Sequence, residues 1–173
     1  MALQDNFRKA MRSYVYSVSI LSNTNENSEC HAITVSSVTS VSIDPPSLLV
    51  CINKSASIHD SIVIGSKFCI NLLTKNHEEL SNICSSYENE NKRFQSDEWD
   101  LTDIPFLKRA QANIFCEVDQ LISYHTHSIV FGKVLKSSNS DDINTLTYVD
   151  GRYEYAIYLF SSHFLFFSNF RRL

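Results

Sequence analysis

The chain is 173 residues long and 43% hydrophobic, which is enough for one domain with its own core. Its formal net charge of −4, without a basic stripe, argues against a protein that binds nucleic acid. Because it has only 3 glycines, and neither G-x-G-x-x-G nor G-x-x-x-x-G-K-[ST] occurs, a Rossmann turn and a P-loop are excluded.

The first 41 residues predict a short helix and two strands. Apolar residues recur at helical spacing over 7–11, and the alternation over 14–22 is typical of a β-strand. The polar stretch 24–29 predicts a hairpin connection. From 32 to 41 Thr, Ser and Val nearly alternate, which predicts a strand with one face lined by hydroxyl groups.

The middle of the chain predicts two buried strands and two short helices. The prolines of 44–46 end the preceding strand, and the apolar run 47–53 predicts a strand buried on both faces. Another buried strand is expected at 67–73. Two pairs of residues are expected to begin the helices: Ser57 with Asp60, and Asn76 with Glu79.

The last third predicts three strands, near 110–122, 129–136 and 145–148. Short strands with two inserted helices and no regular βαβ rhythm predict a mainly β fold, an antiparallel Greek-key barrel with short helices. We expect one domain over 1–153 and an aromatic tail over 154–173. The tail is too short, and too interrupted by polar residues, to span a bilayer of about 30 Å, so no membrane association is expected.

The cysteines and the N-terminus indicate a reducing compartment. The 5 cysteines include no C-x-x-C pair, and Cys51, Cys69 and Cys116 lie in apolar runs, so we expect neither a disulfide framework nor a zinc ribbon. The first residues, MALQDN, contain no charged segment followed by an apolar stretch. We therefore expect no signal peptide and a cytoplasmic location.

Two neighbouring segments are candidates for ligand binding. The hydroxyls and free backbone groups of 34–43 suit the polar edge of a flat heteroaromatic ring, although the same pattern is typical of an exposed sheet face. The segment 53–57, N-K-S-A-S, brings two hydroxyls and an ammonium to a predicted helix start, which favours a phosphate site. A plain helix cap with a solvated lysine is the alternative.

Two further motifs carry groups that could act in a site. Arg93 stands beside Phe94 and before Trp99, so it could pair with phosphate, stack on a ring, or be a surface arginine. His125 and His127 would share a strand face, but no third ligand has suitable spacing, so no metal site is expected. A single histidine beside a cofactor and a partly exposed strand histidine both remain open.

Six motifs occur in a distinctive order: FRKAMR (7–12), TVSSVTSVSIDPPSLLVCINKSAS (34–57), FCINLL (68–73), RF (93–94) followed by Trp99, HSIVFGKV (127–134) and LTYVDGRY (146–153). Over about residues 5–153 the chain resembles the flavin reductase-like family, which are FMN-binding split-barrel proteins. The resemblance implies a homodimer with flavin near its interface and hydride transfer from NADH or NADPH to FMN or FAD. It also implies a possible monooxygenase partner that receives the reduced flavin.

The resemblance further implies a role for each matching residue. The isoalloxazine edge would meet the strand residues Thr34, Val35, Ser36 and Ser37. The ribityl chain and phosphate would be lined by Cys51, Ile52, Asn53, Lys54, Ser55, Ser57 and Ile58, with Arg93 at the phosphate end. The histidine beside which the nicotinamide docks, taken as the catalytic residue, matches His127, with Tyr148, Asp150, Gly151 and Tyr153 close by.

The chain departs from the family pattern at several positions. His125-Thr126 stands where the family usually has Gly-Asp, and Lys92 replaces an acid before Arg93. Two other functions therefore stay open beside the flavin reductase: a flavin-binding protein without efficient hydride donation, and a split-barrel relative of haem or pyridoxal-phosphate proteins. FMN is favoured over FAD because no adenosine-specific site is identifiable. The sequence does not choose between NADH and NADPH.

Overall fold

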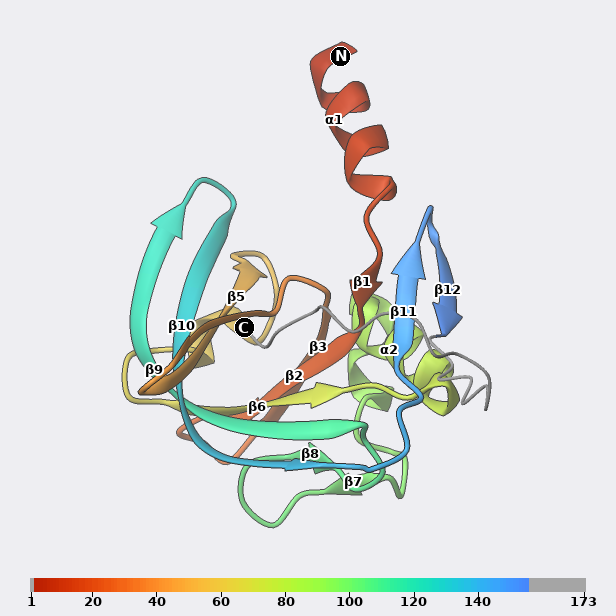
Figure 1. The fold of residues 1–173 in the computed structure, drawn as a ribbon. Coiled ribbons are helices and arrows are strands. Elements are labelled where there is room, and N and C mark those ends of the chain that lie inside the picture. Colours follow the sequence, from red (N-terminus) through yellow and green to blue (C-terminus); the bar gives the residue numbers. More distant parts are fainter. Residues whose placement is uncertain (1, 156–173) are drawn as a thin grey trace.

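The computed structural model describes residues 2–155, which form a mainly antiparallel β structure with short helices (Figure 1). Its elements are α1 (Ala2–Arg12), β1 (Tyr16–Ser17), β2 (Ser19–Thr24), β3 (Cys30–Val35), β4 (Thr39–Ile43), β5 (Pro46–Asn53), the 3-10 helix η1 (His59–Ser61), β6 (Lys67–Leu72), η2 (Lys75–His77), α2 (Glu78–Ser85), η3 (Tyr87–Lys92), β7 (Trp99–Asp100), β8 (Phe106–Leu107), β9 (Ala112–Tyr124), β10 (His127–Asn139), β11 (Leu146–Val149) and β12 (Arg152–Tyr155).

Seven strands form the main sheet in the order β3-β2-β6-β9-β10-β5-β4, and every pair of adjacent strands in it is antiparallel. A three-stranded sheet, β1-β11-β12, and a two-stranded sheet, β7-β8, complete the structure. Val35 of β3 and Leu48 of β5 belong to one buried cluster although four strands separate them in the sheet. The sheet therefore curls around its core, which confirms the expected antiparallel barrel class.

Gly132 of β10 packs closely against Phe68 and Cys116. A Cβ atom at this position would stand 2.6 Å from Cζ of Phe68 and 3.0 Å from Cβ of Cys116. Real Cβ atoms do not approach a ring atom that closely, so any residue other than glycine at position 132 would clash with the Phe68 ring.

The hydroxyl-rich stretch 32–41 is not one strand. It divides into β3 and β4, which occupy opposite edges of the main sheet. Between them, the Ser37 hydroxyl accepts from the amide of Cys51 at 3.0 Å and donates to its carbonyl at 3.2 Å. This side chain takes the place of ladder hydrogen bonds and lets the chain cross from one edge to the other.

Strand β5 corrects a second expectation. Only its alternate residues Leu48, Val50 and Ile52 are buried, so one face of the strand packs on the core and the other is partly exposed. The predicted run 47–53 was apolar on both faces, which is why the sequence alone suggested burial on both.

The helix starts differ from the expected ones. Ser57 caps no α-helix, because only the short 3-10 turn η1 follows it, without a side-chain cap. Before α2, the capping box joins Thr74 to His77 rather than Asn76 to Glu79. The Nδ1 atom of His77 accepts from the Thr74 amide at 3.1 Å, so an imidazole fills the role usually held by Glu or Gln.

Two hairpins and the N-terminal helix shape the upper part of the molecule in Figure 1. The β9–β10 hairpin turns at His125, whose φ of 47° lies in the left-handed region, so His125 and His127 do not share a strand face. The β11–β12 hairpin, whose second strand was not predicted, turns at Asp150 and Gly151. Helix α1 extends away from the barrel and has no buried residue.

The aromatic tail expected over 154–173 falls almost wholly outside the described residues, because only Glu154 and Tyr155 are included, as the end of β12. Within residues 2–155, no helix has both the length and the apolar character needed to cross a membrane.

Candidate functional site

A cavity of about 360 Å³ brings together two groups of sequence-predicted site residues. Thr34, Val35 and Ser36 come from the end of β3, whereas the other group comes from the β11–β12 hairpin more than 110 positions later. The lining consists of Val18, Thr34, Val35, Ser36, Asn82, Ser85, Tyr148, Gly151 and Tyr153. Its volume falls in the range of about 300–1,000 Å³ that is typical of small-molecule sites.

Ser81 of α2 fixes the two walls of this cavity against each other. Its carbonyl accepts the hydroxyl of Thr34 at 2.7 Å, and its own hydroxyl is 2.9 Å from the phenol oxygen of Tyr153. Ser81 itself is fully buried, and both hydrogen bonds are partly buried. The ring of Tyr148 meets that of Tyr153 edge to face, with centroids 5.2 Å apart.

The sequence analysis missed the contribution of α2 to the cavity. The helical periodicity pointed to Leu80, Ile83 and Cys84 as the apolar face; Leu80 and Cys84 are buried in the structure, and Ile83 is half-buried. Asn82 and Ser85, on the polar face, gave no signal beyond ordinary solvent exposure, yet both line the cavity.

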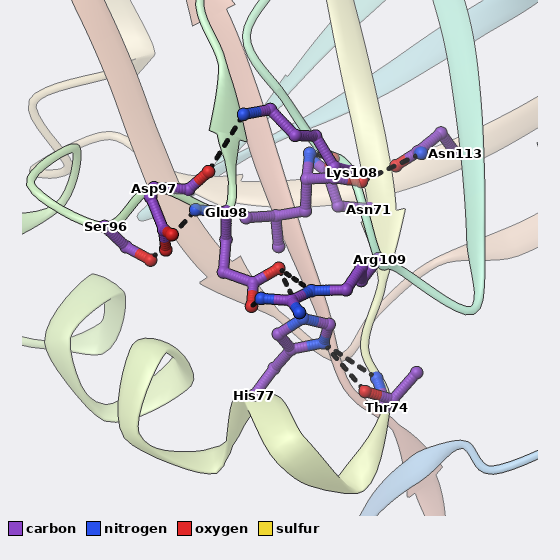
Figure 2. Close-up of polar contacts among 10 residues, drawn as sticks. Asn71, Thr74, His77, Ser96, Asp97, Glu98, Lys108, Arg109 and Asn113 are labelled. Atoms are coloured by element: carbon purple, nitrogen blue, oxygen red, sulfur yellow. Dashed lines mark hydrogen bonds and ion pairs between the residues drawn. The ribbon is translucent and has the colours of Figure 1, made fainter.

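A polar network holds the start of α2 on the barrel (Figure 2). His77 is buried, and burial lowers the pKa of its imidazole, so the neutral ring accepts hydrogen bonds from Thr74. Its Nε2 atom lies 4.0 Å from Oε2 of Glu98, whose carboxylate is paired with Arg109. That hydrogen bond to Arg109 is the main reason that the pKa of Glu98 is lowered.

None of the nine cavity-lining residues carries a charged side chain. Hydroxyl groups, an amide and phenol rings can donate to, accept from and stack on an uncharged aromatic heterocycle. A phosphate group would find no counter-charge inside the cavity and must lie outside it.

Arg93 lies next to the α2 side of the cavity and fits a phosphate group. Its residue is 6% exposed, and its guanidinium donates to Ser57 Oγ at 3.3 Å and to the carbonyl of Ser86 at 3.1 Å. Glu90 forms an ion pair with it at 3.4 Å. Its Nε atom is buried without a hydrogen-bond partner among the described residues, which leaves one donor of a charged group for a ligand.

The structure places Arg93 and Ser57 together as the sequence suggested, but it directs Lys54 elsewhere. The Lys54 ammonium donates to Ser123 Oγ and to the His125 carbonyl, both at 2.7 Å. The side chain of Asn53 accepts from both the amide and the hydroxyl of Ser55. Lys54 therefore braces the β9–β10 hairpin, and the segment 53–57 forms no helix-start phosphate cradle.

The remaining predicted residues lie around the same end of the barrel. His127 is exposed, pairs with Asn53 in the ladder, and its Nδ1 atom is 2.9 Å from Thr126 Oγ1. His127 does not line the cavity. Ile52 and Ile58 are fully buried in the core, so only their backbone could meet a ligand.

A larger depression, of about 830 Å³, lies elsewhere between the β2–β3 turn and the loop around Gly65. Ser57 is the only predicted site residue that lines it. Because residues of two predicted segments, 34–36 and 148–153, line the smaller cavity, we take the smaller cavity as the candidate site.

The thiol near Arg93 is not a candidate nucleophile. Burial raises the pKa of Cys84 to about 12, so its thiolate is scarcely populated at neutral pH. Within residues 2–155, no cluster of three or more His, Cys, Asp or Glu side chains could hold a metal ion. The hydroxyl, amide and phenol groups that line the cavity suit the binding and orientation of a ligand.

An antiparallel barrel with an uncharged, hydroxyl- and phenol-lined cavity belongs to the class of small β-barrel domains that bind a flat heterocyclic ligand. Residues 11–156 match the family model described as "Flavin reductase like domain", and the chain belongs to this family. This finding confirms the resemblance that the sequence motifs carried.

Individual relatives agree with that assignment. The chain is 36% identical over 152 residues to "FMN reductase (NADH) RutF" of Pantoea ananatis, covering 87% of this chain and 80% of that protein. It is 32% identical over 151 residues to the reductase component of an FADH(2)-dependent resorcinol hydroxylase from Rhizobium sp., covering 86% and 84%. The crystal structure of BorF, the flavin reductase component of a bacterial two-component tryptophan halogenase, matches with a TM-score of 0.78 at 25% identity, covering 88% and 97%.

Proposed function

We propose that this protein is a flavin reductase that transfers hydride from NADH to FMN. The observation that carries the proposal is the convergence of Thr34, Ser36, Tyr148 and Tyr153 on one uncharged cavity in a chain of the flavin reductase-like family. Relatives named as NADH-dependent FMN reductases support FMN as the flavin and NADH as the donor. NADPH and FAD are the alternative substrates to be compared with them.

In this proposal the cavity residues bind and orient the flat rings. The hydroxyls of Thr34 and Ser36 and the amide of Asn82 provide donors and acceptors for the polar ring edge, and Tyr148 provides an aromatic face. Hydride passes directly from the nicotinamide to the flavin, so the protein needs no nucleophile and contributes mainly proximity and alignment.

The phosphate of the flavin is assigned to Arg93 and Ser57. Ser85 lines the cavity, and the carbonyl of the next residue, Ser86, accepts from Arg93, so the guanidinium lies directly behind the cavity wall. The other residues implied by the family motifs, Cys51 to Ser55 and Asp150, remain proposals for the ribityl chain and the nicotinamide. His127 remains the proposed residue for docking the nicotinamide.

We also propose a homodimer. Large apolar side chains are exposed on α1 and on β4, including Leu3 at 82%, Phe7 at 64% and Ile43 at 83%. Exposed apolar area of this kind is typical of an interaction surface. Light scattering at micromolar concentration is expected to give twice the monomer mass, and a monomer with flavin bound would exclude the dimer.

A monooxygenase that consumes reduced flavin is the proposed partner, because the resorcinol hydroxylase and tryptophan halogenase relatives are named as reductase components. The cytoplasm, where NADH is available, is the proposed location. Residues 1–153 are the proposed flavin reductase domain, and 154–173 a separate tail.

The decisive experiment uses the purified full chain with NADH and catalytic or excess FMN. We expect flavin-dependent loss of NADH absorbance and, without oxygen, bleaching of the flavin band. NADPH, FAD and riboflavin serve as comparison substrates. Flavin that binds but is not reduced at a rate above the uncatalysed reaction would exclude the reductase and favour a flavin-binding protein.

A further inference from the structure

The uncharged cavity leaves a gap in the proposed site. FMN carries one phosphate and NADH carries a pyrophosphate, and a cation beside the cavity would strengthen the binding of either group. Arg93 supplies one on the α2 side. The opposite wall of the cavity is the β11–β12 hairpin, so a second cation would have to lie beside this hairpin.

Arg12, the last residue of α1, lies over the tip of this hairpin. Its Nη2 and Cζ atoms stand 3.8 and 3.9 Å from the position that a Cβ atom of Gly151 would occupy. Gly151 itself lines the cavity. The guanidinium therefore lies at the hairpin side of the cavity mouth.

The Arg12 side chain is free to bind a ligand. Across residues 2–155 it makes no hydrogen bond and no ion pair within 4.0 Å, and it is exposed. Two neighbouring arginines are already paired: Arg8 with Asp5 at 3.0 Å, and Arg152 with Glu154 at 3.3 Å.

Hydrogen bonds hold the backbone around Arg12 in place, so the base of the Arg12 side chain is fixed at the hairpin tip. The carbonyl of Arg12 accepts from the amide of Asp150 at 2.9 Å, which ties the end of α1 to the hairpin tip. The carbonyls of Ala10 and Met11 accept from Ser13 and Tyr14. The electronegative end of the helix is therefore satisfied locally, which reduces its repulsion of a nearby anion.

We propose that Arg12 binds a phosphate group of a nucleotide substrate at the mouth of the cavity, a role that rests on the proposed flavin reductase function. The shared chemistry is a phosphate dianion or diester, held by a planar guanidinium that can donate two parallel hydrogen bonds. The group comes either from FMN or from the pyrophosphate of NADH. Arg93 and Arg12 then hold phosphates on opposite sides of one uncharged cavity.

The test compares wild type, Arg12→Ala, Arg12→Lys and Arg8→Ala. Arg8 is the matched control, because it is an exposed arginine on the same helix whose charge is already paired. FMN and riboflavin dissociation constants are measured by fluorescence titration, and the KM for NADH by steady-state kinetics. Thermal melts establish that each variant is folded.

Arg12→Ala is expected to weaken the affected substrate about five- to tenfold, less than a buried contact because solvent and salt screen an exposed charge. A weaker FMN affinity with unchanged riboflavin affinity assigns the flavin phosphate. A raised KM for NADH with both flavin affinities unchanged assigns the pyrophosphate. Arg12→Lys should recover part of the loss, and added salt should reduce the difference from wild type.

Unchanged FMN, riboflavin and NADH parameters in a folded Arg12→Ala protein would overturn the inference, as would an equal effect of Arg8→Ala. These results are distinct from failure of the proposed function. In that case wild type itself would not reduce FMN with NADH, whereas the flavin-binding measurements would still report on Arg12.

Discussion

Replacing Arg93 by alanine is expected to weaken FMN binding far more than riboflavin binding. Arg93 is 6% exposed and its guanidinium keeps one buried donor unpaired, so its charge is poorly screened by water. A charge-assisted hydrogen bond of this kind is worth about 1.5–3 kcal/mol, which corresponds to about a ten- to hundredfold rise in the Kd for FMN. Riboflavin lacks the phosphate and should bind with nearly unchanged affinity.

Arg93 also has a structural role, which the experiment must separate. Its bonds to Ser57 and to the Ser86 carbonyl contribute about 1 kcal/mol each, so Arg93→Ala is expected to melt at a lower temperature. Arg93→Lys keeps the charge, and Glu90→Gln removes the carboxylate that competes with phosphate for the guanidinium. We expect Glu90→Gln to bind FMN at least as tightly as wild type.

Fluorescence titration of both flavins, at a temperature where every variant is folded, measures the difference. If folded Arg93→Ala bound FMN as tightly as wild type, Arg93 would not hold the phosphate. Equal losses for FMN and riboflavin would show that the substitution damages the ring cavity instead.

Three other predictions test separate parts of the molecule. His127→Ala is expected to leave flavin affinity unchanged but to raise the KM for NADH or slow hydride transfer about ten- to hundredfold in stopped flow. His125→Gly places a glycine where the backbone has a φ of 47°, and this variant should keep full turnover. Gly132→Ala should destabilise the fold by about 1–3 kcal/mol in urea unfolding, because its Cβ would stand 2.6 Å from the Phe68 ring; an unchanged midpoint would contradict this packing. Burial lowers the pKa of His77 below its ordinary 6.5, so the unfolded chain takes up the proton first and the free energy of unfolding should fall as pH drops below about 6.5. His77→Gln, which keeps the capping box, should show a smaller fall. Equal pH profiles for the variant and the wild type would exclude His77 as the cause.

Apolar runs and alternation were reliable guides to the barrel strands. The predicted strand at 67–73 appears as β6, and the strand predicted at 110–122 overlaps β9, which begins and ends two residues later, because both carry apolar residues that form the core. The short strand β12 was missed, since RYEY offers no apolar run and its place is set by pairing with β11. Local pattern fails where tertiary pairing decides the structure.

Single side-chain hydrogen bonds explain the other failures. The strand expected over 32–41 breaks at Ser37 because that hydroxyl binds the backbone of Cys51, a residue 14 positions away. The turn at His125 was not predicted as a turn, because a positive φ is uncommon for any residue other than glycine. The family's glycine at this position has a physical reason, since glycine adopts that backbone conformation without strain.

The distribution of charge in the site fits the chemistry proposed for it. Direct hydride transfer between two rings requires alignment and exclusion of water but no proton donor or acceptor at the reacting atoms. The described cavity agrees, because none of the side chains that line it is a carboxylate, ammonium, guanidinium, imidazole or thiol. Charge is instead held outside, by Arg93 behind α2 and by Arg12 over the hairpin tip, where the phosphates of two nucleotides would end. Because a cation inside the cavity would have to be desolvated whenever an uncharged ring is bound, placing both arginines outside keeps ring stacking and phosphate binding independent. Substitutions at the arginines should therefore weaken phosphate-bearing substrates selectively, whereas substitutions at Thr34, Tyr148 or Tyr153 should weaken FMN and riboflavin alike and slow hydride transfer.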